Sequence, residues 1–245
     1  MSQIATMQKL EEMRLSGFTR AYREMSETGK NRDYTTDEVI AHLVQAEWDD
    51  RYNRRLQRLL TSARFRYKAS MEEIDYVFQR NLDKSVMLRL SSCDWITKHQ
   101  SVIITGSTGL GKSFLASALG QQACQHGHRV FYRNSSKLFD ELKIAKADGS
   151  YIKEINKIEK FDLFILDDFG LKSLDNNQRL MLLELLEDRH GKRSTIIASQ
   201  LPVNKWYEII GDPTIADAIL DRLVHSSHRI ELEGKESMRK KYKIN

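Results

Sequence analysis

The first part of the chain repeats apolar residues at helical spacing. Between residues 4 and 25 they recur mostly every three or four positions, with charged residues between them. Thr35 and Glu38 stand at the capping-box distance that opens a helix, and apolar positions follow with the same period. Ser70 and Glu73 repeat this distance and predict a third helix through residue 82. No alternating strand pattern interrupts these stretches, so an all-helical N-terminal region is expected.

From residue 95 onward the pattern changes, because short apolar runs alternate with amphipathic stretches. This alternation is typical of a parallel sheet covered by helices. We therefore expect an α/β fold with a five-stranded parallel sheet, and three parts: a helical N-terminal domain at 1–68 for DNA binding or oligomerisation, a connecting helix at 69–94, and a core at 95–245. The expected strands are 102–105, 129–133, 163–166, 195–198 and 228–232.

Composition narrows the class of protein. The chain has 245 residues, of which 40% are hydrophobic, enough to bury a core. No apolar run approaches the ~18 residues of a membrane span, and the N-terminus lacks the order of a secretory signal. Cys93 and Cys124 fall in different expected elements without pairing or metal spacing. These features predict a cytoplasmic protein with reduced thiols and no membrane partner.

The most specific motif is a glycine-rich phosphate-binding loop, G-x-x-x-x-G-K-[ST]. Its glycines permit turns that aim backbone N–H groups at phosphate oxygens, its lysine reaches the β- and γ-phosphates, and its serine hydroxyl binds Mg²⁺. An expected strand precedes the loop and an expected helix follows it, as phosphate binding at a helix N-terminus requires. ATP and Mg²⁺ are the predicted ligands. The motif comprises Gly106, Ser107, Thr108, Gly109, Leu110, Gly111, Lys112 and Ser113.

Two carboxylates end the expected strand at 163–166. Asp167 is predicted to hold Mg²⁺ with Ser113, and Asp168 to polarise the water that attacks the γ-phosphate. The alternative is an acidic pair that only ends a strand. Because aspartate is one methylene shorter than the more usual glutamate, hydrolysis is expected to be slow.

Two further residues are candidates for sensing or stabilising the γ-phosphate. Ser199 follows the expected strand 195–198 and would contact the phosphate, although a simple strand cap explains it nearly as well. Arg222 follows an expected helix and would reach the γ-phosphate of a neighbouring subunit as an arginine finger. The competing interpretation of Arg222 is a salt bridge at the end of that helix.

Positive charge is concentrated just before the core. The net charge of +5 is mild for the whole chain. Residues 51–68, however, contain basic residues and no acidic ones, a pattern that favours sequence-independent binding of double-stranded DNA. A solvated helix face or a stripe of salt bridges between subunits is the alternative. The predicted DNA-binding residues are Arg51, Arg54, Arg55, Arg58, Arg64, Arg66 and Lys68.

With these motifs in place, the chain resembles the IstB-like transposition helper ATPases. These belong to the AAA+ initiator and helicase-loader group, beside the DnaC-type loaders. The resemblance covers nearly the whole chain and is most specific after residue 95. It rests on the stretches 166–170, 199–203, 216–223 and 234–239.

The resemblance implies a P-loop AAA+ core that binds ATP, forms an ATP-dependent homo-oligomer on DNA, and helps a cognate transposase to engage its target. Hydrolysis would be slow and stimulated by DNA or the partner. The resemblance assigns Ser199 to sensor 1, Arg222 to the arginine finger and Arg239 to a second sensor. Only 15 residues follow Ile230, too few for a full C-terminal lid, and the alternative for Arg239 is a contact with a neighbouring subunit or with DNA.

Three other functions remain open at this stage. A DnaC-like replicative helicase loader would use the N-terminal helices to bind a helicase. A small-molecule kinase also uses a P-loop, but the acidic pair and the finger candidate argue against it. A nucleotide-dependent scaffold with negligible hydrolysis stays possible because Asp168 replaces the usual glutamate.

Overall fold

The computed structural model describes residues 3–29, 34–234 and 236–238. The chain forms two compact units, Met1–Arg58 and Leu59–Asn245. The second unit therefore begins well before residue 95, where the sequence pattern changes. Among the described residues, none of the helices combines the length and hydropathy that a membrane crossing requires.

The N-terminal unit contains α1 (Gln3–Glu12), α2 (Ser16–Thr28) and most of α3 (Thr36–Ala63). The predicted capping box opens α3, since Thr35 N donates to Glu38 Oε2 at 2.8 Å and Glu38 N donates to Thr35 Oγ1 at 3.3 Å. Glu47 of α3 accepts hydrogen bonds from the first amides of α2, which lack partners within their own helix. Together with a small apolar cluster around Leu43, this contact joins α2 to α3.

The second unit is built on a parallel five-stranded sheet in the order β2-β3-β4-β1-β5. All five predicted strands are confirmed. In the inner strands β1, β3 and β4 apolar residues are buried on both faces of the sheet, which explains their continuous apolar runs, whereas the edge strand β5 alternates. The strands are β1 (Ser101–Gly106), β2 (Val130–Asn134), β3 (Leu163–Phe169), β4 (Ser194–Ser199) and β5 (Ser227–Leu232).

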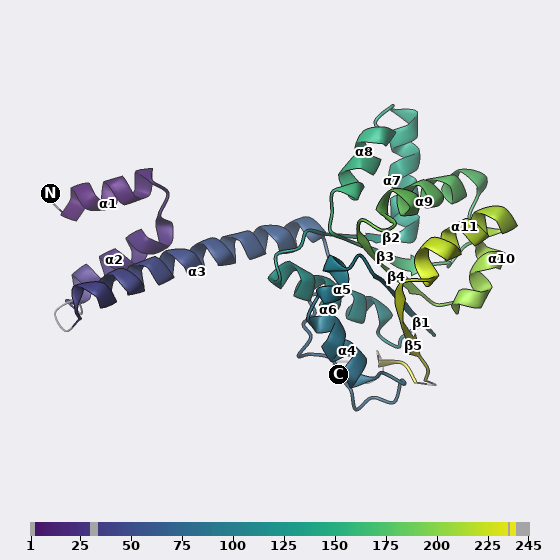
Figure 1. Ribbon diagram of the computed structural model, residues 1–245, viewed down its shortest axis with the longest axis horizontal. Helices are drawn as coiled ribbons and strands as arrows, with labels where there is room; N and C mark the ends of the chain where they lie inside the picture. The colour runs from purple at the N-terminus through teal and green to yellow at the C-terminus, as the bar shows by residue number, and fades with distance from the viewer. Residues whose placement is uncertain (1–2, 30–33, 235, 239–245) are drawn as a thin grey trace, which may run out of the picture. The chain divides into compact units, whose positions relative to one another are not determined.

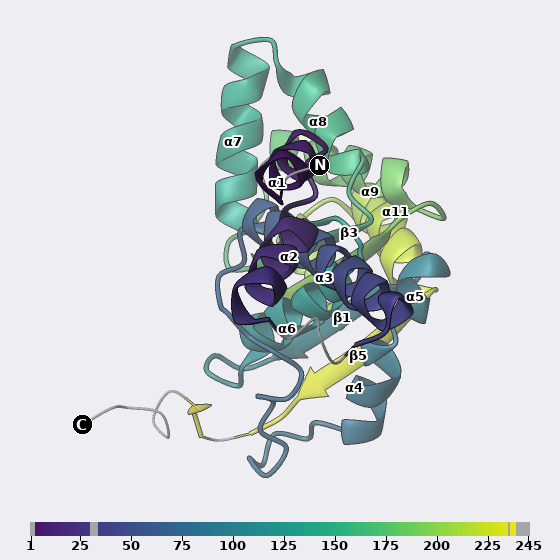
Figure 2. The same cartoon turned by 90° about the vertical axis from the view of Figure 1, so that its left-hand side faces the viewer.

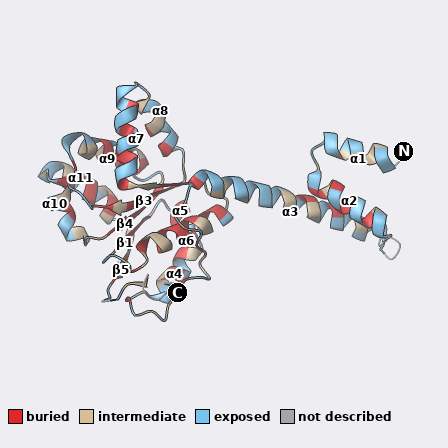
Figure 3. Cartoon of the chain, turned by 180° about the vertical axis from the view of Figure 1, so that it is seen from behind, coloured by how far each residue is buried: buried red, intermediate tan, exposed pale blue. Residues whose placement is uncertain are grey.

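Helices cover both faces of this sheet and give three layers (Figure 1). One face carries α4 (Lys84–Ser91), α5 (Asp94–Thr97) and α6 (Lys112–Gln125). The other carries α7 (Ser135–Ala147), α8 (Tyr151–Glu159), α9 (Asn176–Arg189), α10 (Trp206–Ile210), preceded by the short 3-10 helix η2 (Val203–Lys205), and α11 (Pro213–Val224). Helices α7 and α8 lie side by side in both views (Figures 1 and 2). The three inner strands β1, β3 and β4 are almost wholly buried, the edge strand β5 is partly exposed, and the outer helix surfaces are exposed (Figure 3).

The predicted connecting helix at 69–94 is wrong for most of its length. Residues 70–83 form no helix, and α4 begins only at Lys84. Ser70 N does donate to Glu73 Oε2 at 2.9 Å, as the capping-box spacing predicts. The chain then turns, because the Asp75 carboxylate accepts hydrogen bonds from the amides of Val77 and Phe78. Buried Arg80 donates to the carbonyl of Asp75 at 3.0 Å. Local turns and a buried cation thus replace the helix that the spacing suggested.

Candidate functional site

The glycine-rich loop lies between β1 and α6, as predicted. Gly109 and Gly111 have φ values of +88° and +87°, which side chains other than glycine rarely adopt. A Cβ at Gly109 would also collide with the Ser237 side chain, and the Gly109 carbonyl accepts from Met238 N at 2.9 Å. The loop is therefore held close to residues 237–238, with its last residue, Gly111, at the N-cap of α6. This is a suitable cradle for phosphate groups.

Lys112 is the first residue of α6 and is buried. Its Nζ donates to the carbonyls of Gly106 at 2.6 Å and Ser107 at 2.9 Å. The ammonium group is thus held over the loop itself. From this position it supplies a positive charge to the phosphates that the loop would bind.

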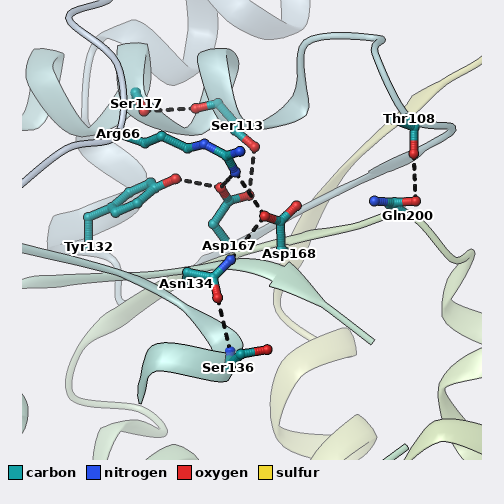
Figure 4. A network of polar contacts seen from close by, with 10 residues as sticks. All are labelled: Arg66, Thr108, Ser113, Ser117, Tyr132, Asn134, Ser136, Asp167, Asp168 and Gln200. Atoms are coloured by element: carbon teal, nitrogen blue, oxygen red, sulfur yellow. Dashed lines mark hydrogen bonds and ion pairs between the residues drawn. The ribbon is translucent and has the colours of Figure 1, made fainter. Parts of the chain in front are cut away.

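Asp167 and Ser113 form the candidate metal site. Asp167 is almost fully buried, and its Oδ1 accepts from Ser113 Oγ at 2.9 Å (Figure 4). A carboxylate and a hydroxyl are oxygen ligands that suit Mg²⁺. The described residues contain no group of three or more His, Cys, Asp or Glu side chains that could hold a metal alone. This donor set fits Mg²⁺ bound mainly through phosphates and water.

The other oxygen of Asp167 is held from the opposite side. Tyr132 of β2 donates its hydroxyl to Asp167 Oδ2, and Arg66 Nη1 lies 3.5 Å from the same oxygen. Burial, together with the negative charge of Asp167, raises the pKa of Tyr132 well above its usual value, so this residue stays a neutral donor. Oδ1 is left on the side of Ser113 and the loop.

Asp168 adopts an unusual backbone conformation. Its φ is +56°, and the register of β3 against β4 shifts between Leu166 and Phe169. This bulge lets two consecutive carboxylates face the loop, because an undisturbed strand would point them to opposite faces. Asp168 Oδ2 accepts from Arg66 Nη1 at 2.8 Å and from Asn134 Nδ2 at 2.9 Å (Figure 4).

A cavity of about 630 Å³ lies over the loop, within the usual range for small-ligand sites. It extends from the carboxylates to aromatic and polar residues that precede the core, so it has room for more than phosphate groups. It is lined by Arg66, Tyr67, Lys68, Glu73, Asp75, Arg80, Thr108, Gly109, Gly111, Lys112, Ser113, Phe114, Asp168, Gln200 and Met238.

Ser199 does not line this cavity. It is fully buried, its Oγ donates to the Phe169 carbonyl at 2.8 Å, and it accepts from Leu201 N at 3.1 Å. The prediction that Ser199 faces the phosphate is therefore corrected, since it caps the end of β4. The next residue, Gln200, lines the cavity instead, and its Oε1 accepts from Thr108 Oγ1 at 2.6 Å (Figure 4).

Arg222 lies on α11 and does not line the nucleotide cavity of its own chain. Its Nη2 is 2.8 Å from Glu187 Oε1, and Nη1 donates to the Ala218 carbonyl at 2.9 Å. This is the salt bridge that the sequence offered as the alternative to an arginine finger. Arg239, the predicted second sensor, lies outside the described residues.

The basic stretch divides into three groups. Arg51 and Arg54 on α3 form ion pairs with Glu47 at 2.6 Å and Asp50 at 2.7 Å, one turn earlier. Arg66 and Lys68, which were also predicted to bind DNA, line the nucleotide cavity. The remaining predicted residues, Arg55, Arg58 and Arg64, are exposed.

Sequence reasoning missed four residues of the site. Tyr132 and Asn134 lie on β2, whose carboxyl end adjoins that of β3. Finding them would have required knowing that these two strands are neighbours in the sheet. Gln200 follows the predicted sensor directly. Arg80 gave no signal, because its burial and its 2.8 Å hydrogen bond to the Leu110 carbonyl depend on the irregular segment 70–83.

Comparison with known proteins agrees with this site. Residues 8–245 match the family described as IstB-like ATP binding protein. An insertion sequence ATP-binding protein of Sinorhizobium fredii, y4pL, is 45% identical over 235 residues, 96% of each chain. Another, of the insertion sequence IS21 from Pseudomonas aeruginosa, is 31% identical and covers 89% of this chain and 82% of its own.

Among solved structures, DnaI shares the fold with a TM-score of 0.57 at 18% identity, over 72% of this chain and 93% of its own. The family match spans nearly the whole chain and includes the glycine-rich loop, both carboxylates and the residues around them. The chain belongs to the IstB-like ATP-binding proteins of insertion sequences and has their AAA+ P-loop fold.

Proposed function

We propose that this chain is an ATP-hydrolysing, DNA-binding regulator of transposition that assembles on double-stranded DNA and assists a cognate transposase in target selection and strand transfer. The observation that carries the ATPase part is the hydrogen-bonded pair Ser113–Asp167 beside Asp168, at the end of a glycine-rich loop. The insertion-sequence names of the relatives support a role beside a transposase. The setting that this function implies is the cytoplasm.

In the proposed reaction the backbone amides of residues 106–113 and Lys112 bind the phosphates. Asp168 accepts a proton from a water molecule, whose oxygen forms a bond to the γ-phosphorus. The bond from the γ-phosphorus to the bridging oxygen breaks, and ADP leaves with that electron pair. Ser113 and Asp167 would hold Mg²⁺, which would supply positive charge to neutralise the phosphates.

Two residues would sense or complete this reaction. Gln200 lines the cavity and bonds to Thr108 of the loop, so we assign it the γ-phosphate contact first predicted for Ser199. Arg222 would act on the ATP of a neighbouring copy, after leaving Glu187. Hydrolysis would then depend on ATP-driven assembly, and the short Asp168 side chain would keep it slow without DNA or transposase.

DNA binding is assigned to the basic residues around the end of α3. Arg55, Arg58 and Arg64 are exposed and lie outside the lining of the nucleotide cavity, and we take them as the DNA contacts. Each phosphate contact contributes about 0.9 to the slope of log affinity against log salt. Three contacts per chain predict a slope near −3, and Arg55→Ala with Arg58→Ala should reduce its magnitude by roughly two.

The alternative, a DnaC-like helicase loader, rests on fold alone. DnaI is 18% identical to this chain, whereas a relative named for an insertion sequence is 45% identical. We therefore favour the transposition role.

Phosphate release from Mg²⁺-ATP tests the proposal, measured with and without duplex DNA and with light scattering of the same samples. We expect slow release alone, faster release with DNA, and ATP-dependent assembly. Lys112→Ala should lose nucleotide binding and serves as the background for release. A chain that binds ATP but releases no more phosphate than this variant, with or without DNA, contradicts the ATPase assignment. A monomer under all conditions contradicts assembly and the action of Arg222 in trans.

A further inference from the structure

The short segment that follows α3 is tightly fixed against the ATPase site. Ala63 and Ala69 at its two ends are buried. Between them, the Phe65 ring lies edge-on to Tyr132 with ring centroids 6.2 Å apart. Gly120 of α6 permits this approach, because a Cβ there would collide with the Phe65 ring.

The same segment is also anchored at Tyr67. The Tyr67 carbonyl accepts from Gln121 Nε2 of α6 at 3.0 Å, and the Tyr67 ring lies 6.5 Å from the Phe114 ring. Residue 66 is therefore held from both sides on the first helix of the nucleotide site. The position of its side chain follows from this packing.

From this position Arg66 reaches the two carboxylates (Figure 4). Its Nη1 lies 2.8 Å from Asp168 Oδ2 and 3.5 Å from Asp167 Oδ2, and its guanidinium lies 5.5 Å from the centre of the Tyr67 ring. Within the described part of the chain, both hydrogen bonds to the Asp168 carboxylate go to Oδ2, from Arg66 and Asn134. Asp168 lines the cavity, where a water molecule would have to be polarised, and these bonds leave Oδ1 for that role.

Holding one oxygen of a carboxylate fixes the direction of the other. A general base must lie about 2.6–3.2 Å from the proton that it accepts, and a misplacement of about 1 Å can reduce a rate by about 10². Asp168 has a short side chain and stands on a bulged strand. Two donors on Oδ2 restrict the rotation of this carboxylate.

We propose that Arg66 is a positioning residue for ATP hydrolysis in its own chain: it holds Asp168 so that Oδ1 faces the attacking water. This inference rests on the proposed ATPase function and deepens it. It also gives the basic stretch a second use. Arg66 follows α3 by three residues, so the segment that joins the helical unit to the core contributes directly to the hydrolytic site.

Steady-state hydrolysis by the full chain without DNA tests this role, because a residue that only contacts DNA has no effect there. The variants are Arg66→Gln and Arg66→Lys. The matched control is Arg89→Gln, which removes the same charge from an exposed position on α4 outside the cavity. Thermal unfolding and the affinity for a fluorescent ATP analogue show whether each variant is folded and binds nucleotide.

We expect Arg66→Gln to lower kcat at least about tenfold and to change KM less than about threefold, since orientation of the base is lost and phosphate binding is kept. Arg66→Lys should recover part of the rate, because an ammonium can still pair with Oδ2 but lacks the planar fork of arginine. Arg89→Gln should match the unmodified chain.

Several results would overturn the proposal. They are a kcat of Arg66→Gln equal to that of Arg89→Gln, a kcat above that of the unmodified chain, or a rise in KM alone. If Arg66→Gln fails to fold, a folded Arg66→Lys variant with an unchanged kcat has the same meaning, whether or not its KM rises. Absence of hydrolysis by the unmodified chain would instead refute the ATPase function itself, and the role of Arg66 with it.

Discussion

Replacing Arg189 with methionine should destabilise the core unit by a few kcal/mol. Arg189 ends α9 and is 1% exposed. Its guanidinium donates to the carbonyls of Ile158 and Phe161, both at 3.0 Å, and to that of Ser194 at 2.6 Å. It thus ties the end of α8 and the start of β4 to α9. Methionine keeps much of the volume, so the change tests the hydrogen bonds more than a cavity.

The magnitude follows from two opposing effects. Each buried carbonyl left without a donor costs about 1–3 kcal/mol. The Ile158 carbonyl still accepts from Phe161 N at 3.2 Å, so the other two carbonyls give about 2–6 kcal/mol. Against this, burial lowers the pKa of Arg189 to about 9, which means that the native state also bears a cost for holding the cation away from water. Removing the cation recovers part of that cost. We expect a net loss of about 2–4 kcal/mol in the free energy of unfolding.

Urea unfolding followed by circular dichroism measures this loss. Arg193→Met is the matched control, because Arg193 is partly exposed and pairs with Asp162 at 3.1 Å. A pair of this kind contributes about 0–1 kcal/mol. If Arg189→Met is as stable as the unmodified chain, the desolvation cost of the buried cation equals the stabilisation from its hydrogen bonds. That result would contradict the expected net loss.

Three further predictions concern the site and the thiols. Asp168→Asn should bind ATP normally and lower kcat by about 10² or more in a phosphate-release assay, because asparagine cannot accept the proton. Burial raises the pKa of both Cys93 and Cys124 to about 12. A disulfide reagent at pH 8 should therefore label neither thiol until the chain unfolds, and the thiols should make the unfolding free energy fall as the pH rises above about 9. Glu187→Gln should keep or raise hydrolysis at high protein concentration, and Arg222→Ala should lower it; equal loss in both variants would show that Arg222 acts only through the salt bridge.

The strands and the phosphate loop were predictable because their signals are local. A strand buried on both faces is a short apolar run, and a loop that binds phosphate needs glycine at fixed positions. The segment 70–83 was not predictable in this way. Its capping-box contact between Ser70 and Glu73 forms, yet the chain turns at Asp75 and buries Arg80. Partners that hold Arg80 lie far along the sequence at Leu110 and Met238.

The error at Ser199 has a geometric cause. Successive residues of a strand point to opposite faces, so a polar pair at a strand end offers two choices for the phosphate contact. The choice depends on register. Ser199 pairs with Thr105 of β1 and with Phe169 beyond the bulge of β3, which places its hydroxyl against the Phe169 carbonyl. The hydroxyl of Ser199 thus faces β3 while Gln200 lines the cavity, and the residue types alone do not reveal this choice.

The basic stretch shows why charge on a helix has to be counted over neighbouring turns. Residues 51–68 contain no acidic residue. Glu47 and Asp50, however, lie one turn earlier on the same face of α3 and form ion pairs with Arg51 and Arg54. At the other end the helix stops at Ala63, so helical spacing no longer applies to Arg66. Its charge faces Asp167 and Asp168 instead. The same run of residues therefore contains paired surface charges, candidates for DNA phosphates and a residue that lines the cavity over the glycine-rich loop.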